Sequence, residues 1–475
     1  MNFDLSEEQQ VIKDLALQIF SGQATVERVK AVEKGDGFDR DLWDQLASSG
    51  IQALCVPEEF GGSGFGAVEL SLALMGQGRH VAPVPLWTSG VAALALADFG
   101  SSSQQSALLP GIATGATVVA IALAEQGAND VMRPTVVGTT SGGQVRINGF
   151  KPAVPFAQHA SLALVPILLD GSVQVALIDL TATPGITWSQ VSTTNREPQA
   201  HLDFDITIPV ESILGHGAGI DGREALRSLY EHSLAALAAI QVGVAEGSLA
   251  LTATHLSGRT QFGKPLSAFQ ATTQRAADGY ITTEAMRVTA LNAAWRLSEG
   301  FDARRDVAVA AYWASEGAQQ VVTAAQHLHG GIGADIDYPV HRYFLWGIQL
   351  ASVLGSASSI CPDSATSSPA PEKRTTHDFD TSRHSHLCQR HGGRRDRSFR
   401  IAPDAHADRQ HGDRHPRLSS GSPRSVHRRR AWFEGHHHEH PHVERIRRPL
   451  RHRLGRTEQL HLVGQGSPRC AELSR

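Results

Sequence analysis

One segment of this sequence combines residue types that bind phosphate with types that pack on rings. The segment RTQFGKPLSAFQ, residues 259–270, places Arg259 and Lys264 beside Phe262 and ends on the amide of Gln270. A guanidinium can hold a pyrophosphate through two parallel hydrogen bonds, while an aromatic ring packs on a sugar or a base. A polar turn between two helices has a similar composition, so these residues alone leave both interpretations open.

Three further motifs have simpler interpretations. In QHLHGGIG, His327 and His329 precede two glycines, Gly330 and Gly331, which can end a helix or let a ligand approach the backbone. From these residues alone, the end of a helix is favoured over a ligand site. The glycines of GGSGFG, residues 61–66, follow no expected strand and indicate a turn. The segment HHHEHPH near the C-terminus could chelate zinc only on a rigid scaffold, which its surroundings do not predict, so no metal site is expected.

The elements that must position these residues fall into three blocks. Helical periodicity begins at Ser6, which together with Gln9 has the capping-box spacing, and continues through residues 1–115. Short β-rich segments bounded by Gly, Asp, Asn and Pro follow, and predict an antiparallel β domain over residues 116–220. Long helical patterns return over residues 221–359 and predict a four-helix bundle. The predicted fold class is therefore α+β, in several domains.

The last 115 residues have a different composition from the rest. Residues 361–475 hold 22 Arg and one Lys against seven Asp and six Glu, a formal charge of +10, whereas residues 1–360 carry −14. This segment also has 15 of the 24 His and only 15 Leu, Ile, Val and Phe, too few to bury a core. We expect residues 360–475 to be an unfolded tail. A shifted reading frame near codon 360 of a GC-rich gene would give such a composition; a genuine disordered tail and a nucleic-acid-binding arm are the alternatives, ranked in that order.

The remaining composition points to a protein of the cytoplasm. Residues 1–360 contain one cysteine, Cys55, so no disulfide framework is expected. The N-terminus MNFDLSEEQQ lacks the basic start of a signal peptide, and no run of 18 apolar residues occurs downstream. We therefore expect no membrane partner and a cytoplasmic location.

Five features taken together resemble the acyl-CoA dehydrogenase family, between about residue 2 and residue 359. They are the helix, strand, helix order and, in the family's sequence, the segments FDLSEEQQ, PEEFGGSGFG, RTQFGKPLSAFQ and HLHGGIGADIDYPVHRYF. Within the family, the segments GYITTEAMRVTALNAAWRLSEG and HRYFLW resemble actinobacterial members that degrade steroid side chains, of which some consist of two unlike subunits. In the predicted β domain, AEQGANDV, residues 124–131, resembles the family's flavin and substrate loop.

The resemblance implies an activity, a cofactor and partners. The family converts an acyl-CoA thioester to the trans-2-enoyl-CoA, with a carboxylate removing the proton from Cα and FAD accepting the hydride from Cβ. An electron-transfer flavoprotein is the expected acceptor of the electrons. The implied assembly is a homotetramer, or a heterotetramer with a paralogous subunit, with FAD at the subunit interfaces, so the bundle would be the FAD-binding and oligomerisation domain.

The resemblance also assigns cofactor residues. The implied FAD contacts are Arg259, Phe262, Gln270, His327, Gly330, Gly331 and Ser356. In relatives the first three belong to a neighbouring subunit. The flavin side departs from the family: Gln126 replaces the usual Pro, and Ala153 and Pro155 stand where relatives place a Trp and a Thr.

The catalytic base departs further from the family. Most relatives have a Glu at the position of Leu354, and a second group has it on the first bundle helix at the position of Ser233. Neither residue here is a carboxylate. Glu231 lies two residues before Ser233, but about 100° per residue turns its side chain roughly 200° away on a regular helix.

Either Glu231 acts as the base in an active homotetramer, or this chain is a base-less subunit that completes FAD sites for a catalytic paralogue; the second version is favoured. A retired dehydrogenase scaffold that binds nucleic acid through its basic tail is the alternative from another class.

Overall fold

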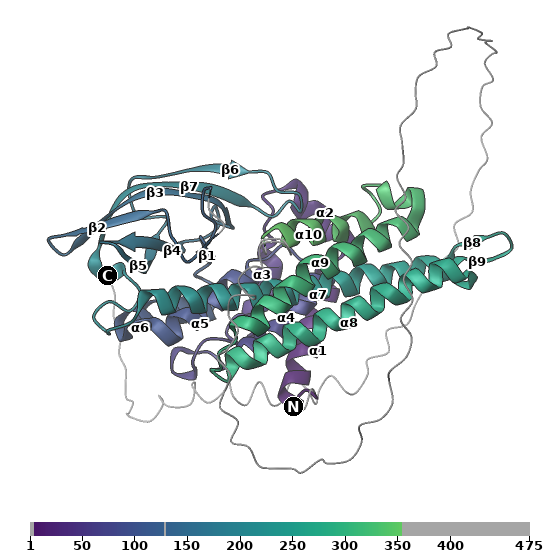
Figure 1. The fold of residues 1–475 in the computed structure, drawn as a ribbon, viewed down its shortest axis with the longest axis horizontal. Helices are drawn as coiled ribbons and strands as arrows, with labels where there is room; N and C mark the ends of the chain where they lie inside the picture. The colour runs from purple at the N-terminus through teal and green to yellow at the C-terminus, as the bar shows by residue number, and fades with distance from the viewer. Residues whose placement is uncertain (1–3, 128–129, 354–475) are drawn as a thin grey trace, which may run out of the picture. The chain divides into compact units, whose positions relative to one another are not determined.

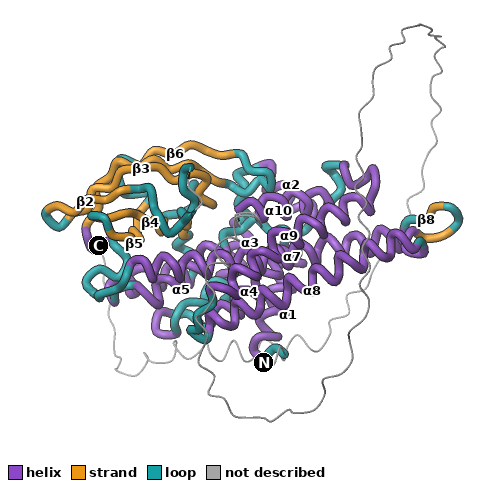
Figure 2. Tube along the Cα trace, viewed as in Figure 1, coloured by secondary structure: helices purple, strands orange, loops and turns teal. Residues whose placement is uncertain are grey.

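The computed structural model describes residues 4–127 and 130–353, and in this part of the chain helices, strands and helices follow one another in the predicted order (Figures 1 and 2). This confirms the α+β class. The expectations for Leu354, Ser356, the HHHEHPH segment and the tail concern residues outside the described part, and they stay predictions.

Six helices form the N-terminal part. The first begins where the capping box predicts it, because the Ser6 hydroxyl accepts from the Gln9 backbone N–H at 3.2 Å and the Gln9 side chain accepts from the Ser6 N–H at 3.0 Å. The helices are α1 (Glu7–Gln23), α2 (Val26–Lys34), α3 (Arg40–Ser48), α4 (Ala67–Arg79), α5 (Leu86–Phe99) and α6 (Ser102–Ala113).

A seven-stranded sheet follows, and it is mixed rather than antiparallel throughout. Strand β4 pairs in parallel with β1 and with β2, while the other pairings are antiparallel. The prediction of a purely antiparallel sheet was therefore wrong at these two pairings, which join segments far apart in the sequence. The strands are β1 (Val119–Ile121), β2 (Val137–Ser141), β3 (Gln144–Pro155), β4 (Leu162–Leu169), β5 (Ser172–Asp179), β6 (Ile186–Val191) and β7 (Gln199–Pro209).

The predicted four-helix bundle is confirmed, and helix α7 is its longest member. Its 37 residues pack against α4, α8, α9 and α10. Among the described helices α7 alone is long and apolar enough to cross a bilayer, but 78% of that stretch is buried inside the protein, as in a core helix. The bundle helices are α7 (Gly222–Gly258), α8 (Gln270–Ser298), α9 (Arg304–His329) and α10 (Val340–Val353).

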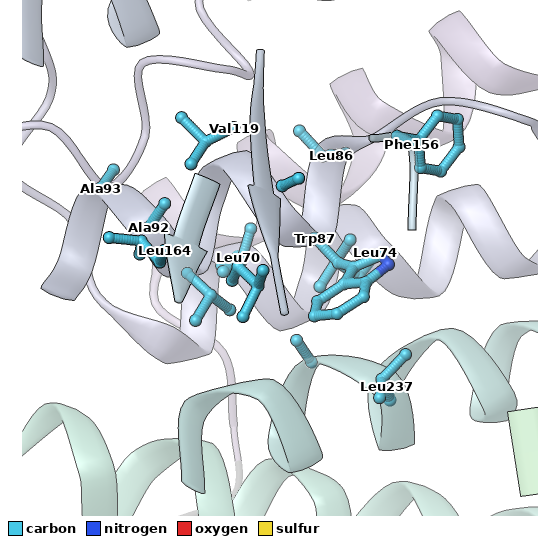
Figure 3. Packing of buried hydrophobic residues seen from close by; sticks show 14 of the residues in the cluster. Leu70, Leu74, Leu86, Trp87, Ala92, Ala93, Val119, Phe156, Leu164 and Leu237 are labelled. Atoms are coloured by element: carbon cyan, nitrogen blue, oxygen red, sulfur yellow. The ribbon is translucent and has the colours of Figure 1, made fainter. Parts of the chain in front are cut away.

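One hydrophobic core joins the helices to the sheet. Figure 3 shows Leu70 of α4, Trp87 of α5, Val119 of β1 and Leu237 of α7 among its members. All four side chains are buried. Because α4, α5 and α7 share this core with the sheet, the position of α7 is coupled to both neighbouring parts.

Helices α4 and α7 touch backbone to backbone at glycines. A Cβ atom added to Gly78 would lie 2.0 Å from the carbonyl oxygen of Ile240, and one added to Gly243 would lie 2.0 Å from that of Met75. A Cβ on Gly247 would lie 2.4 Å from the Arg79 oxygen. No larger residue fits at these three positions unless the helices separate.

We predict that Gly243→Ala destabilises the protein by about 1–3 kcal/mol, because the added methyl must push one backbone away from another. Gly22→Ala is the matched control: nothing lies within 4 Å of its added Cβ, and removing a glycine from helix α1 should stabilise by about 0.5–1 kcal/mol. Urea unfolding followed by circular dichroism measures both. Equal midpoints for the two variants would contradict the packing argument.

Candidate functional site

The segment predicted to hold a dinucleotide forms a hairpin between α7 and α8. Helix α7 ends at Gly258, and its C-cap residue Arg259 has extended backbone angles. Two short strands follow, β8 (Thr260–Gln261) and β9 (Lys264–Pro265). Phe262 and Gly263 form the turn with φ angles of 51° and 77°. Positive φ angles at both central residues are what a two-residue type I′ hairpin turn requires. The Phe262 side chain is 93% exposed at the turn, which lies at one end of the bundle (Figure 1).

The structure brings Arg259, Phe262 and Gln270 to this one hairpin. The Phe262 ring lies 6.3 Å from the Phe269 ring, edge to face, and the Lys264 ammonium lies 4.4 Å above the Phe269 ring. Gln270 is the first residue of α8. Arg259, Phe262 and Gln270 are all exposed. A cation, a ring and an amide are therefore presented outward together, where a ligand or a second chain can contact them.

A stack of two histidines joins the end of α9 to the end of α7. The imidazoles of His255 and His329 lie 4.5 Å apart and 28° from parallel, and the Tyr338 ring packs 5.3 Å from His329. Burial lowers the pKa of both histidines; Arg259 lowers that of His255 further, and His255 that of His329. Two neutral rings can stack at neutral pH without charge repulsion.

Because of this stack, His327, Gly330 and Gly331 lie at the same end of the bundle as Arg259. All three are exposed. A Cβ added to either glycine would meet nothing within 4 Å, so the backbone is open to an approaching ligand. His255 and Tyr338 were not predicted for this site, because no local pattern marks residues that meet only when two helix ends converge.

The flavin side of the predicted site contains a buried ion pair. Lys151 of β3 and Glu125, in the loop that resembles the family's flavin loop, form a salt bridge, and both side chains are almost fully buried. The other Glu125 oxygen accepts from the Thr135 hydroxyl at 2.6 Å and from its N–H at 3.2 Å. Burial lowers the pKa of Lys151, and the Glu125 charge opposes that change. The pair ties the loop to the strand.

Strand β3 is irregular next to this pair. Its register with β7 shifts between Lys151 and Val154, and Ala153 adopts a φ of 49°. The Ala153 N–H donates to His201 Nδ1 at 3.1 Å. Pro155 lies opposite Gln199 of β7. Ala153 and Pro155, at the positions where the resemblance implies a Trp and a Thr, thus lie on and beside a β-bulge and offer neither an indole nor a hydroxyl group.

We predict that Lys151→Met costs about 3–5 kcal/mol of stability, because it leaves the Glu125 carboxylate buried without its counter-charge. In the double variant with Glu125→Gln the loss should be much smaller: no charge remains buried, and the glutamine oxygen still accepts from Thr135. Urea midpoints of the two variants and the parent measure this. A double variant as unstable as Lys151→Met would contradict the assignment.

The two candidate base positions among the described residues face different surroundings. Ser233 is buried, and its hydroxyl donates to the Leu229 carbonyl at 2.7 Å. Glu231 is half-buried. Burial raises the pKa of its carboxyl group, as does Asp302, whereas Arg227 and Arg304 lower it. Leu354 lies outside the described residues.

The predicted base and the predicted dinucleotide residues lie far apart within one chain. Glu231 and Arg259 are separated by 28 residues of continuous helix. At 1.5 Å per residue this is about 42 Å. The electrostatic neighbours of Glu231, Asp302 and Arg304, come from the connection between α8 and α9, whereas the hairpin connects α7 and α8 at the other end. If one cofactor uses both sets of residues, they must come from different protomers.

A helical part, a mixed sheet and a helical bundle with an exposed hairpin at one end define the class of fold. Comparison with known proteins identifies the class. Residues 6–116 match the N-terminal domain of acyl-CoA dehydrogenases, and residues 221–355 match their C-terminal domain. The chain belongs to the acyl-CoA dehydrogenase family.

The relatives include a curated protein and two solved structures. Acyl-CoA dehydrogenase FadE27 of Mycobacterium tuberculosis is 34% identical over 375 residues, which cover 75% of this chain and 96% of the relative. A variant of the Tcur3481-Tcur3483 steroid ACAD is 40% identical, with a TM-score of 0.71, and the match covers 76% of this chain and 97% of that one. The ChsE4-ChsE5 complex from Mycobacterium tuberculosis is 33% identical, with a TM-score of 0.73, covering 78% and 100%. These similarities confirm the predicted resemblance to steroid-type members of the family.

Proposed function

We propose that this chain is the base-less subunit of a two-subunit, FAD-dependent acyl-CoA dehydrogenase. The observation that carries the proposal is that the base position on α7 holds a buried serine, Ser233, whose hydroxyl donates to the Leu229 carbonyl, while the Arg259 hairpin, about 40 Å further along the helix, faces outward. Each subunit would lend its hairpin to a site whose base lies in its partner. A chain without a base could then still complete a working site.

The chemistry explains why a missing carboxylate matters. When bound, FAD supplies the two-electron oxidation of the acyl Cα–Cβ bond. Abstraction of the α proton needs a base, and an alcohol whose hydroxyl donates to its own helix, as Ser233 does, does not accept that proton at neutral pH. In the proposed assembly Arg259 binds the FAD pyrophosphate in the partner's site, Phe262 packs on the adenosine, and the partner provides the base.

Exposed apolar side chains on the bundle support a protein partner. Large hydrophobic side chains are exposed on α8, on α9 and after α9, and several such side chains on neighbouring helices are typical of surfaces that contact another chain. They are Tyr280, Ile281, Val288, Val309, Tyr312, Trp313, Ile332 and Ile336. A paralogous subunit packed on these helices would bury them.

The substrate class follows from the relatives' names alone. One solved relative is described as a steroid ACAD, and another is a complex of two differently named chains. We therefore propose a steroid side-chain acyl-CoA thioester as the substrate and an electron-transfer flavoprotein as the acceptor. The small residues Ala153 and Pro155 would leave the flavin side of this chain's own site incomplete, which predicts one FAD per pair of unlike subunits.

We predict that Arg259→Gln weakens FAD binding by about tenfold to a hundredfold in the complex co-purified with the paralogue, because charge-assisted hydrogen bonds of roughly 1.5–3 kcal/mol are lost. Flavin absorbance after dialysis measures this. Arg305→Gln, an exposed arginine in the first turn of α9 at the other end of the bundle, is the matched control and should retain FAD. Equal retention by the two variants would refute the role of the hairpin.

We predict that Glu231→Gln leaves the rate of acyl-CoA oxidation by the complex unchanged within about twofold, because the base lies in the partner. Ferrocenium-coupled turnover measures it. If Glu231 were the base, the rate would fall by about 10²–10⁴. Such a fall, or full activity of the isolated chain, would replace the base-less subunit with an active homotetramer.

A further inference from the structure

Strand β6 forms an open edge of the central sheet. It stands at one end of the pairing order, and among the described strands it pairs with β7 alone (Figures 1 and 2). Its middle residues, 187–190, are all exposed. The edge of a sheet presents a row of backbone N–H and C=O groups with which a further strand can pair.

The hydrogen bonds between β6 and β7 show which groups of β6 are free. The Asp205 N–H donates to the Gly185 carbonyl at 3.2 Å. In an antiparallel pair, residues that exchange hydrogen bonds with the neighbouring strand alternate with residues that turn their N–H and C=O groups away from it. Counting from Gly185, the odd-numbered residues of β6 bond to β7. The even-numbered residues, Ile186, Trp188 and Gln190, direct their backbone groups to the open edge.

This edge lacks the features that usually keep a second strand away. Natural edge strands are protected by lysine, proline, an inward charge or a β-bulge. The pairing of β6 with β7 is regular over its six residues, ITWSQV, which include neither a proline nor a charge. Residues 180–195 contain no Lys, Arg, Asp or Glu. An identical strand would therefore bring no like charge opposite this one, so a second copy of the chain fits the edge electrostatically.

The exposed indole of Trp188 adds an apolar contact at the same edge. Trp188 lies directly opposite Leu202 of β7, which is 2% exposed, so its side chain stands on the core-facing side of the sheet. Trp188 itself is 60% exposed, because β6 is the last strand on this side. A tryptophan brought next to it on an added strand would bury part of both rings and gain from their stacking.

We propose that β6 pairs antiparallel with β6 of a second copy of this chain, which joins the two sheets into one. Trp188 then lies opposite its own counterpart, and Ile186 lies opposite Gln190 of the copy. Each of these pairs exchanges two hydrogen bonds. On the other face Thr187 meets Ser189 of the copy, a hydroxyl pair that is favourable between strands. A register shifted by two residues would leave one of the three free residues of each strand unpaired.

The proposed contact is small and separate from the cofactor site. Stable complexes usually bury about 1,200–2,000 Å², which two strands of this length do not reach, so we expect a weak, concentration-dependent association. The contact uses the edge of the sheet and neither the Arg259 hairpin nor the base positions. It therefore does not rest on the proposed function.

The first test joins the two strands by a disulfide in the full chain, with the three cysteines after residue 360 replaced by serine and the buried Cys55 kept. Trp188→Cys places two thiols opposite each other with Cα atoms about 5.5 Å apart, a distance that a disulfide spans. Mild oxidation should give a covalent dimer whose peptide masses show a link at position 188. Ser189→Cys is the matched control: it is exposed on the same strand, but its counterpart lies diagonally, about 7–8 Å away. It should give at least tenfold less dimer.

The second test removes a hydrogen-bond donor from the open edge. Gln190→Pro deletes an N–H group that faces away from β7, a position at which an edge strand tolerates proline. Sedimentation should show association of copies weakened by about tenfold or more, because each dimer loses two hydrogen bonds. Gln190→Thr is the matched control and should keep the association. Circular dichroism checks that both variants fold.

A measurement on the unmodified chain keeps the proposal testable if Gln190→Pro does not fold. Amide hydrogen exchange at residues 186, 188 and 190 should slow as the concentration of the chain rises. Slowing that appears only when the paralogue is added would assign the edge to a different partner and overturn the proposal. Equal disulfide yields from the two cysteine variants, or unchanged association in a folded Gln190→Pro chain, would also overturn it.

Discussion

The arrangement of the bundle depends on the contact between the backbones of α4 and α7. At Gly78 and Gly243 each helix occupies the space that a side chain of the other would need. Tyr343 of α10 joins them, since its ring packs at Gly247 and its hydroxyl donates to the Arg79 carbonyl. Three helices therefore meet at one place, and glycine is the residue that allows it. This contact fixes the direction of α7 relative to the N-terminal helices.

The direction of α7 determines how a site can be built. The glycine contact lies between the Ser233 position, ten residues before Gly243, and the hairpin at Arg259, twelve residues after Gly247. The two ends of one straight helix cannot converge on one ligand. Under the proposed function, loss of a base from one chain is tolerable, because a chain that keeps an exposed Arg259 and Phe262 would still contribute to a neighbour's site. In that proposal the length of α7 separates the cofactor-binding end of this chain from its base position.

Local features were predictable from the sequence, and features made by distant residues were not. The capping box at Ser6 and the presence of long helices after the sheet follow from spacing within a few residues, and the structure confirms both. The parallel pairing of β1 with β4 was missed because strand direction is set by which distant segments meet in the core. The His255–His329 stack and the Lys151–Glu125 pair were not predicted for the same reason, because each joins residues that are far apart in the sequence. Histidine, lysine and glutamate have no pattern that reveals a partner on another element.

Two buried ion pairs, Lys151 with Glu125 and Arg342 with Glu33, show how lysine and arginine differ in satisfying a buried carboxylate. Both oxygens of Glu125 have partners, Lys151 on one and Thr135 on the other, so this pair needs nothing from outside. The pair of Arg342 with Glu33 is slightly less buried, with side chains 5% and 9% exposed, and a second cation, Arg196, lies 3.7 Å from a Glu33 oxygen. The Arg342 guanidinium holds both oxygens of Glu33 at once, through Nε and Nη2, because its donors form a planar fork. The Lys151 ammonium contacts one oxygen of Glu125 and leaves the other to Thr135, so a lysine needs help from a neighbour where an arginine satisfies the carboxylate alone.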